Sequence, residues 1–419
     1  MKASGVFRSA VILAAAVSLA ACGGGGGTVT ATKSAGQNAA QAANAVAVAV
    51  DGGPTRSGCV NCMFTSVTVC APGSATYCQA IDGILLDTGS TGLRLVSAGA
   101  DGKLTINLPR EQNDNGDDLA ECSQYLDSSY SWGAVRVADV KLGGETAARV
   151  PIDVLSDPDV PASSAPVSCA GTGGFDESTV AALGANGILG VGTYEYDCGA
   201  ACVSGGSPPV DYYDCPSGGT CSPAFVTLAK QLPNPVARFA KDNNGVILDL
   251  PAVQIGAADV TGSMIFGIDT QTNNALGGAL VFPVTPAGNF TGPVVFAGRS
   301  FSAGFIDSGS NGLFFTNVTG IQPCGLNTGF YCPNTPLTLT ATNPGSGGQG
   351  SDVTFQVVNA DQLFANDSSD WAFRPLAGPY PAGQQGFDWG VPFFFGRRVY
   401  VAIENRPTSS GSTGPFWAY

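Results

Sequence analysis

The chain has 419 residues, of which 18 are Lys or Arg, 32 are Asp or Glu and none is His, giving a formal net charge of −14 at pH 7. The absence of histidine excludes the usual Ser-His-Asp, Cys-His and His-Glu-x-x-His sites, and the acidic balance argues against nucleic-acid binding. For a hydrolase, carboxylate chemistry remains. With 58 Gly, 27 Pro and 12% charged residues, the composition favours many short strands joined by turns over helices.

The N-terminus predicts export. Lys2 and Arg8 precede an apolar stretch over residues 10–17, and Leu19-Ala20-Ala21-Cys22 follows, so residues 1–22 are expected to be a signal peptide with a lipobox. The apolar stretch is shorter than the roughly 20 residues that a membrane span needs. Cleavage before Cys22 would leave its thiol to carry a lipid that anchors the protein to the membrane.

The residues after this cysteine give a finer expectation. Gly23 resembles the outer-membrane sorting pattern of Gram-negative lipoproteins, so we expect an exported lipoprotein of the outer membrane that faces the periplasm or the cell surface. Residues 23–50, a glycine run followed by Ala, Gln, Thr and Asn, are expected to form a flexible tether.

Beyond the tether the pattern is that of a mostly-β protein. Short apolar runs at residues 83–86, 246–248, 264–266 and 279–282 are bounded by turn formers and rich in branched or aromatic residues, which predicts strands. The clearest helical pattern covers residues 225–232, before Pro233.

The cysteines predict a disulfide framework. Besides Cys22 there are 12, an even number that in an exported chain allows up to six bridges formed outside the cytosol. Cys324 is expected to pair with Cys332. Four cysteines in a Gly- and Pro-rich insertion are expected to pair among themselves: Cys198, Cys202, Cys215 and Cys221. Cys59-x-x-Cys62 is interpreted as a structural bridge, because no histidine or second such motif supports a redox or metal site. We expect no metal and no cofactor.

Two stretches repeat each other at a distance of 220 residues (307 minus 87): Leu86-Asp87-Thr88-Gly89-Ser90-Thr91-Gly92-Leu93 and Ile306-Asp307-Ser308-Gly309-Ser310-Asn311-Gly312-Leu313. Each places an aspartate after an apolar run and before a small hydroxyl residue and a glycine. One such motif alone would be an ordinary turn. Two make a paired-carboxylate site plausible.

These repeats resemble the catalytic loops of the pepsin-like aspartic peptidases. That family also has an apolar-apolar-Gly segment downstream of each loop, and the candidates here are Ile188-Leu189-Gly190 and Phe394-Phe395-Gly396. Further similarity extends over about residues 75 to 405. The resemblance implies a mostly β, two-lobed double-barrel fold with a few short helices. The N-terminal lobe, residues 51–255, would carry Asp87, and the C-terminal lobe, residues 256–419, would carry Asp307.

The resemblance also implies roles for individual residues. Asp87 and Asp307 would share one proton and activate a water for attack on a peptide bond. The supporting residues would be Thr88 and Ser308 as braces between the loops, Ser90 and Ser310 as donors to the outer carboxylate oxygens, and Gly89 and Gly309 as close backbone donors to the inner oxygens. The expected partner is a peptide or protein substrate bound by a monomer.

Two features depart from this family. Arg94 stands near the position of a tryptophan that usually holds the flap tyrosine, and no Tyr-Gly follows at the expected flap tip, residues 122–127, where Tyr125 is the candidate flap residue. The whole pattern also resembles a family of bacterial lipoproteins with no assigned function. The expected function is therefore a lipid-anchored aspartic endopeptidase. The alternative is a lipoprotein of the same fold without turnover, acting as a peptide-binding or structural envelope protein.

Overall fold

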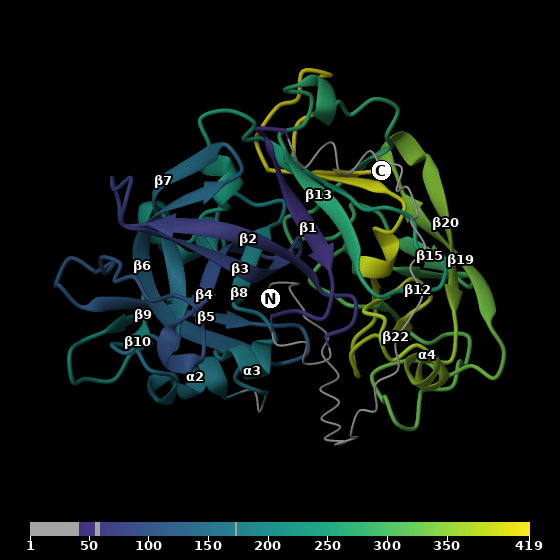
Figure 1. Ribbon diagram of the computed structural model, residues 1–419, viewed down its shortest axis with the longest axis horizontal. Helices are drawn as coiled ribbons and strands as arrows, with labels where there is room; N and C mark the ends of the chain where they lie inside the picture. Colours follow the sequence, from purple (N-terminus) through teal and green to yellow (C-terminus); the bar gives the residue numbers. More distant parts are fainter. Residues whose placement is uncertain (1–41, 55–58, 172–173) are drawn as a thin grey trace, which may run out of the picture.

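The computed structural model describes residues 42–54, 59–171 and 174–419. The predicted signal peptide, the lipidation site Cys22 and residues 23–41 of the predicted tether lie outside these residues. Two lobes stand side by side, and β1 (Ala45–Val50) and β13 (Val260–Phe266) run next to each other between them (Figure 1). The fold is mostly β, as predicted.

The N-terminal lobe is a closed barrel with an extension. Strands β6, β7, β4, β8, β3 and β2 pair in this order, and the pairing of β6 with β2 closes the ring, while β5, β9 and β10 extend the sheet outwards. Closure removes the free sheet edges. The bounds are β2 (Met63–Cys70), β3 (Cys78–Asp87), β4 (Thr91–Val96), β5 (Asp118–Gln124), β6 (Tyr130–Leu142), β7 (Glu145–Leu155), β8 (Gly187–Val191), β9 (Tyr212–Cys215) and β10 (Ser222–Pro223).

The same sheet continues from β2 through β1 and β13 into strands at the base of both lobes: β11 (Gly245–Asp249), β24 (Arg398–Ala402), β25 (Phe416–Ala418) and β14 (Val281–Pro283). The predicted lobe boundary at 255/256 falls between β11 and β13, which are hydrogen-bonded neighbours. It stays a prediction. Of the four predicted apolar strands, three lie within β3, β11 and β13, and the fourth begins two residues late, at Val281 in β14.

The C-terminal lobe is built from smaller sheets. One contains β16 (Arg299–Phe301), β15 (Val294–Phe296), β19 (Leu337–Pro344) and β20 (Gly350–Val357), and a second contains β17 (Gly304–Ile306), β23 (Phe387–Trp389), β18 (Leu313–Phe315) and β22 (Ala377–Pro379). A third pairs β12 (Gly256–Ala257) with β21 (Ala372–Phe373). Aromatic rings fill the space between them, including stacked Phe315 and Phe387 at a centroid distance of 5.3 Å.

Helices are short. The α-helices of the described residues are α2 (Val167–Ala170), α3 (Val180–Leu183) and α4 (Ala360–Asn366). The 3₁₀ turns are η1 (Ala98–Ala100), η2 (Ala162–Ser164), η3 (Gly199–Cys202), η4 (Leu228–Lys230), η5 (Pro235–Arg238), η6 (Thr272–Asn274), η7 (Ser346–Gly348) and η8 (Val391–Phe393).

The predicted helix at residues 225–232 is wrong, because only η4 forms there. The backbone N–H of Val226 donates to the carbonyl of Cys202 at 2.8 Å, and the N–H of Leu232 donates to the Tyr212 hydroxyl at 2.7 Å. Tertiary hydrogen bonds at both ends therefore replace the helical ladder.

The tether prediction is wrong for residues 45–50, which form β1. This strand pairs with β13 along its whole length, from Ala45 opposite Ile265 to Val50 opposite Val260, and its last two residues pair with β2. Val48 and Val50 are buried. The Ala-Val alternation is a strand pattern that gains its stability from two partner strands far away in the sequence.

Six bridges form, the largest number that the cysteine count allows: Cys59–Cys62, Cys70–Cys78, Cys122–Cys169, Cys198–Cys202, Cys215–Cys221 and Cys324–Cys332. The pairings expected for the insertion and for Cys324 are confirmed, as is the structural interpretation of Cys59-x-x-Cys62. Six disulfides indicate an exported protein. Among the described residues, no helix is long and apolar enough to span a membrane.

Candidate active site

The two repeated loops follow the ends of two strands that are built alike. Asp87 ends β3, which lies parallel to β8, and β8 in turn pairs antiparallel with β4 behind the loop. In the other lobe, Asp307 follows β17, which lies parallel to β23, and β23 pairs antiparallel with β18. Each aspartate therefore lies at the end of one strand, and the strand paired in parallel with it, β8 or β23, also pairs with the strand that follows the loop.

The register corrects one sequence prediction. Leu86 lies opposite Leu189 and Asp87 opposite Gly190, so Ile188-Leu189-Gly190 is the paired segment in the first lobe. In the second lobe Ile306 lies opposite Trp389, so the paired segment is Asp388-Trp389-Gly390 and not Phe394-Phe395-Gly396. The sequence search missed it because an aspartate replaces the first apolar residue.

The segment predicted in its place lies elsewhere. Phe395 follows η8 and bridges to Leu250, and the N–H of Gly396 donates to the Leu250 carbonyl at 3.0 Å. It joins the second lobe to the shared sheet and does not support the loop at Asp307.

Reciprocal hydrogen bonds fasten the two loops to each other. The backbone N–H of Thr88 donates to Ser308 Oγ at 3.1 Å, and the N–H of Ser308 donates to Thr88 Oγ1 at 2.9 Å. Each hydroxyl then donates to a strand of the opposite lobe: Ser308 to the Leu86 carbonyl at 2.8 Å and Thr88 to the Ile306 carbonyl at 3.4 Å. The geometry has approximate twofold symmetry and holds the loops back to back.

The aspartates are also oriented alike. Oδ1 of each accepts the N–H of the glycine two residues later, Gly89 or Gly309, at 2.7 Å. Oδ2 of Asp87 accepts the Ser90 hydroxyl at 2.5 Å, and Oδ2 of Asp307 accepts the Ser310 hydroxyl at 3.0 Å.

Only glycine fits beside these carboxyls. A Cβ at Gly89 would lie 2.7 Å from Asp307 Oδ1, and a Cβ at Gly309 would lie 2.7 Å from Asp87 Oδ1. Each loop thus touches the carboxyl of the other, and a side chain at either position would push the pair apart.

Burial makes double ionisation of this pair unfavourable. Asp87 is 1% exposed and Asp307 is fully buried. Burial raises the pKa of Asp307 well above its usual value, and the charges of Asp87 and Asp388 and a hydrogen bond with Asp87 raise it further. The arrangement can hold one proton between the two carboxyls at neutral pH.

Asp388 is a third carboxyl at this site, and sequence reasoning missed it. It is fully buried in β23, and its Oδ2 lies 2.6 Å from Ser310 Oγ. The signal that could have found it is the sequence Phe387-Asp388-Trp389-Gly390, in which an aspartate stands between two aromatic residues and a glycine follows the second of them.

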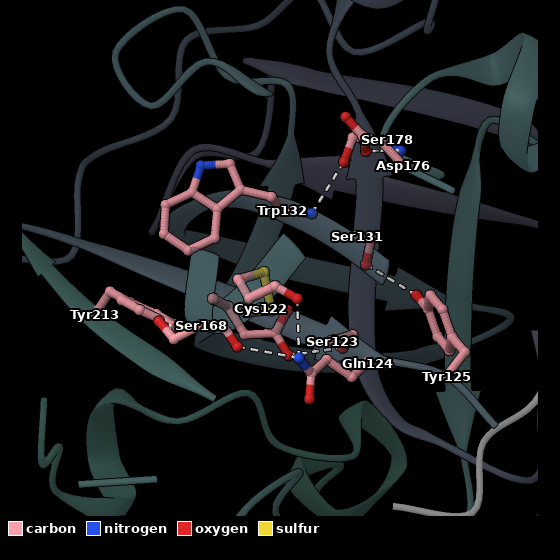
Figure 2. The surroundings of a disulfide bond; sticks show 12 residues. Cys122, Ser123, Gln124, Tyr125, Ser131, Trp132, Ser168, Asp176, Ser178 and Tyr213 are labelled. Atoms are coloured by element: carbon pink, nitrogen blue, oxygen red, sulfur yellow. Dashed lines mark hydrogen bonds between the residues drawn. A yellow bond between two sulfur atoms is a disulfide. The ribbon is translucent and has the colours of Figure 1, made fainter. Parts of the chain in front are cut away.

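The predicted flap corresponds to the β5–β6 hairpin, whose turn covers residues 125–129, so residues 122–124 still belong to β5. Tyr125 is 6% exposed and packs in an apolar cluster with Leu85 and Ile188. Figure 2 shows its hydroxyl turned to Ser131 Oγ, at 2.9 Å. Burial raises the pKa of Tyr125. The ring therefore lies inside the first lobe beside the strands that carry Asp87 and Gly190.

The hairpin is anchored along β5. The disulfide Cys122–Cys169 ties it to α2, and Gln124 Nε2 donates to the carbonyls of Ser168 at 3.1 Å and Cys169 at 2.8 Å (Figure 2). Arg94, which stands where the resemblance expects a tryptophan, is buried and pairs with Glu121 of β5 at 2.9 Å. A buried ion pair thus connects β5 of the hairpin to β4.

A segment of the first lobe is fastened to the second lobe beside the Asp307 loop. Asn61 is 1% exposed, and its Nδ2 donates to the carbonyls of Asn311 at 2.9 Å and Phe373 at 2.8 Å. Its Oδ1 accepts the Phe373 N–H at 2.6 Å, and its own N–H donates to the Trp371 carbonyl at 2.7 Å. We call residues 59–62 the Asn61 bridge. It ties the first lobe to the Asp307 loop through Asn311.

Groups of potential metal ligands in the described part of the chain lie away from the paired aspartates. They are Cys198, Cys202 and Asp211, and Cys324, Cys332 and Asp361. In both, the cysteines are joined in disulfides, which leaves no thiolate to bind a metal.

Comparisons with known proteins agree with this architecture. The aspartic proteinase from Irpex lacteus has a similar structure, with a TM-score of 0.50 and 18% identity over 89% of this chain and 96% of that chain. At this identity the likeness shows the fold alone, which is the two-lobed pepsin-like fold. No curated protein matches the sequence. A family model described as "Protein of unknown function (DUF3443)" matches residues 40–419, and the chain therefore belongs to this family.

Proposed function

We propose that the protein is an aspartic endopeptidase that hydrolyses peptide bonds with Asp87, Asp307 and a water held between them. The observation that carries the proposal is the reciprocal contact of the two loops, in which each glycine lies against the opposite carboxyl and the hydroxyls of Thr88 and Ser308 cross between lobes. A turn motif without this function has no need of a precisely matched partner 220 residues away.

The residues suggest a division of labour. Asp307, the more deeply enclosed group, would carry the shared proton and donate it to the carbonyl oxygen of the substrate. Asp87, which accepts hydrogen bonds from Gly89 and Ser90, would act as the base that deprotonates the water. The roles are those of a coupled pair, so the proton belongs to both groups until substrate binds.

The substrate would be an extended peptide. Such a chain can lie across the two loops through backbone hydrogen bonds, with its side chains in apolar pockets.

The test is cleavage of a peptide library from acid to neutral pH, with and without pepstatin. Asp87→Asn and Asp307→Asn should each lower the rate by at least about 10³-fold, because each removes half of a proton-transfer pair. Asp114→Asn is a matched control, since Asp114 is fully exposed and, within the described part of the chain, forms an ion pair only with Lys230, at 3.5 Å. Cleavage that survives in Asp87→Asn would overturn the proposal.

A second candidate is a peptide-binding or structural protein without turnover. The enclosure of the pair favours it, because Asp87 and Asp307 are 1% and 0% exposed. In that case peptides would bind, or nothing would bind, and no pepstatin-sensitive hydrolysis would occur.

We also propose that the protein is a lipoprotein of the outer membrane, anchored through Cys22. The lipobox supports this, and the disulfides agree with export. Cys22→Ser should move the protein from the membrane fraction to the soluble fraction, and mass spectrometry of the N-terminal peptide would show whether a lipid is present. A membrane-bound Cys22→Ser variant would contradict the anchor.

A further inference from the structure

Asp388 breaks the symmetry of the two loops. In the first lobe the residue opposite Leu85 is Ile188, and the equivalent residue in the second lobe, opposite Phe305, is Asp388. An apolar side chain is thus replaced by a carboxyl in the same layer, one residue before the position that faces Ile306. The N-terminal loop has no such group at this position.

Ser310 stands between two carboxyls. Its Oγ lies 3.0 Å from Asp307 Oδ2 and 2.6 Å from Asp388 Oδ2, both within hydrogen-bonding distance. A serine hydroxyl has one proton and can donate to only one of these oxygens at a time. Hydrogen bonds from Ser310 Oγ to both Asp307 Oδ2 and Asp388 Oδ2 require two protons. The serine supplies one, so one of the two carboxyls must supply the other.

The surroundings indicate which carboxyl supplies it. Asp307 Oδ1 accepts the Gly309 N–H, whereas Asp388 Oδ1 is buried and has no hydrogen-bond partner among the described residues. A buried carboxylate without donors is strongly destabilised relative to the neutral acid. Asp388 is therefore the group that loses more by ionising.

Among the described residues, no Lys or Arg compensates the charge of this carboxyl. Its neighbours across β17 and β18 are Phe305 and Phe314, and the titratable groups that face it within the described ranges are Asp87, Asp307 and Tyr380. Burial raises the pKa of Asp388 well above its usual value; the Ser310 hydrogen bond lowers it in part, and the charge of Asp87 raises it again.

We propose that Asp388 is a positioning residue that keeps its proton at neutral pH and donates it to Ser310, so that the proton of Ser310 is committed to Asp307. The three carboxyls then hold two protons and one negative charge. The proton count is independent of turnover. Its consequence for catalysis rests on the proposed function: the pair of Asp87 and Asp307 would keep its single charge without an acidic environment.

Infrared difference spectroscopy at pH 7 tests the proton count. The spectrum of the full protein minus that of Asp388→Asn should contain the C=O stretch of a protonated carboxyl. The same subtraction with Asp114→Asn, at an exposed aspartate, should contain the two bands of a carboxylate. Carboxylate bands in the Asp388 difference would overturn the proposal.

A second measurement avoids dependence on the variant. Infrared spectra of the unaltered protein, labelled with ¹³C at the aspartate carboxyls, should show isotope-shifted C=O bands of protonated carboxyls that persist at pH 7, where exposed aspartates are ionised. Spectra without such a band would also overturn the proposal. Failure of the proposed function would appear differently, as the absence of hydrolysis in every form of the protein, and would leave these bands unchanged.

Discussion

The two aspartate loops have similar backbone hydrogen bonds but differ in the side chains that surround their carboxyls. Around Asp87, Ser90 contacts one carboxyl, the neighbouring strand contributes Ile188, and the loop residues Gly89 and Ser90 are partly exposed. Around Asp307, Ser310 contacts two carboxyls and the whole loop is buried. A symmetric scaffold therefore carries an asymmetric distribution of protons, with one lobe suited to hold negative charge and the other to hold protons.

The largest difference should appear when the two loop serines are removed in turn. Ser310→Ala leaves Asp307 and Asp388 facing each other without the hydroxyl between them, whereas Ser90→Ala removes a donor to one carboxyl. We expect kcat/KM for peptide cleavage to fall by about 10²-fold for Ser310→Ala and about tenfold for Ser90→Ala. Equal losses would mean that Asp388 has no influence on the pair.

The Asn61 bridge contacts the second loop at Asn311 and, outside that loop, Trp371 and Phe373, and its loss should destabilise the protein strongly. Asn61→Ala would leave the N–H and C=O of Phe373 and the C=O of Asn311 without this partner. The free energy of unfolding should fall by about 3 kcal/mol. Urea denaturation with intact disulfides measures it. Asn327→Ala, in a half-buried loop of the second lobe, is a suitable comparison, and a similar loss there would show that the bridge is not special.

The hydroxyls of Ser308 and Thr88, which brace the two loops, should contribute unequally to the free energy of unfolding, and both contributions should be smaller than that of Asn61. Ser308 Oγ donates to Leu86 at 2.8 Å, but Thr88 Oγ1 donates to Ile306 at 3.4 Å. We expect Ser308→Ala to lower the free energy of unfolding by about 2 kcal/mol and Thr88→Val, which keeps the shape of the side chain, by about 1 kcal/mol. Chemical denaturation of both variants decides this. The reverse order would show that the longer contact is the stronger one in solution.

The last effect concerns pH. The pKa of Asp388 is raised in the folded protein, so its contribution to stability is complete below the unfolded pKa and is lost as pH rises through the folded pKa. Asp307 contributes in the same direction. The free energy of unfolding should therefore fall as pH rises from 5 to 6, and Asp388→Asn should reduce the fall over this pH unit by about 1.4 kcal/mol. An unchanged slope would contradict the raised pKa.

The sequence was sufficient for features that are local or repeated. The loops at Asp87 and Asp307 were found because the motif recurs, and Cys324–Cys332 could be paired because the two cysteines are only eight positions apart. Short apolar runs between turn formers also predicted β3 and β13, because the buried residues of these strands follow one another in the sequence.

Features that depend on a distant partner could not be predicted. The place of Asp388 beside the Asp307 loop follows from the register of β23 against β17, and the apolar composition of Phe394-Phe395-Gly396 pointed to the wrong segment. Residues 45–50 resemble a low-complexity linker until β2 and β13 are placed on either side. In both, the pairing of strands decided the structure and local propensity did not.

The position of β1 has a mechanical consequence. This strand is inserted between β2 of the first lobe and β13, which leads into the second lobe. The chain segment before Ala45 therefore enters the fold where the two lobes meet. Any force transmitted along that segment loads the hydrogen-bond ladder that joins the lobes. A chain shortened to begin at residue 51 would lack the joining strand, and the alignment of the two lobes would then depend more heavily on the hydrogen bonds of Thr88, Ser308 and Asn61.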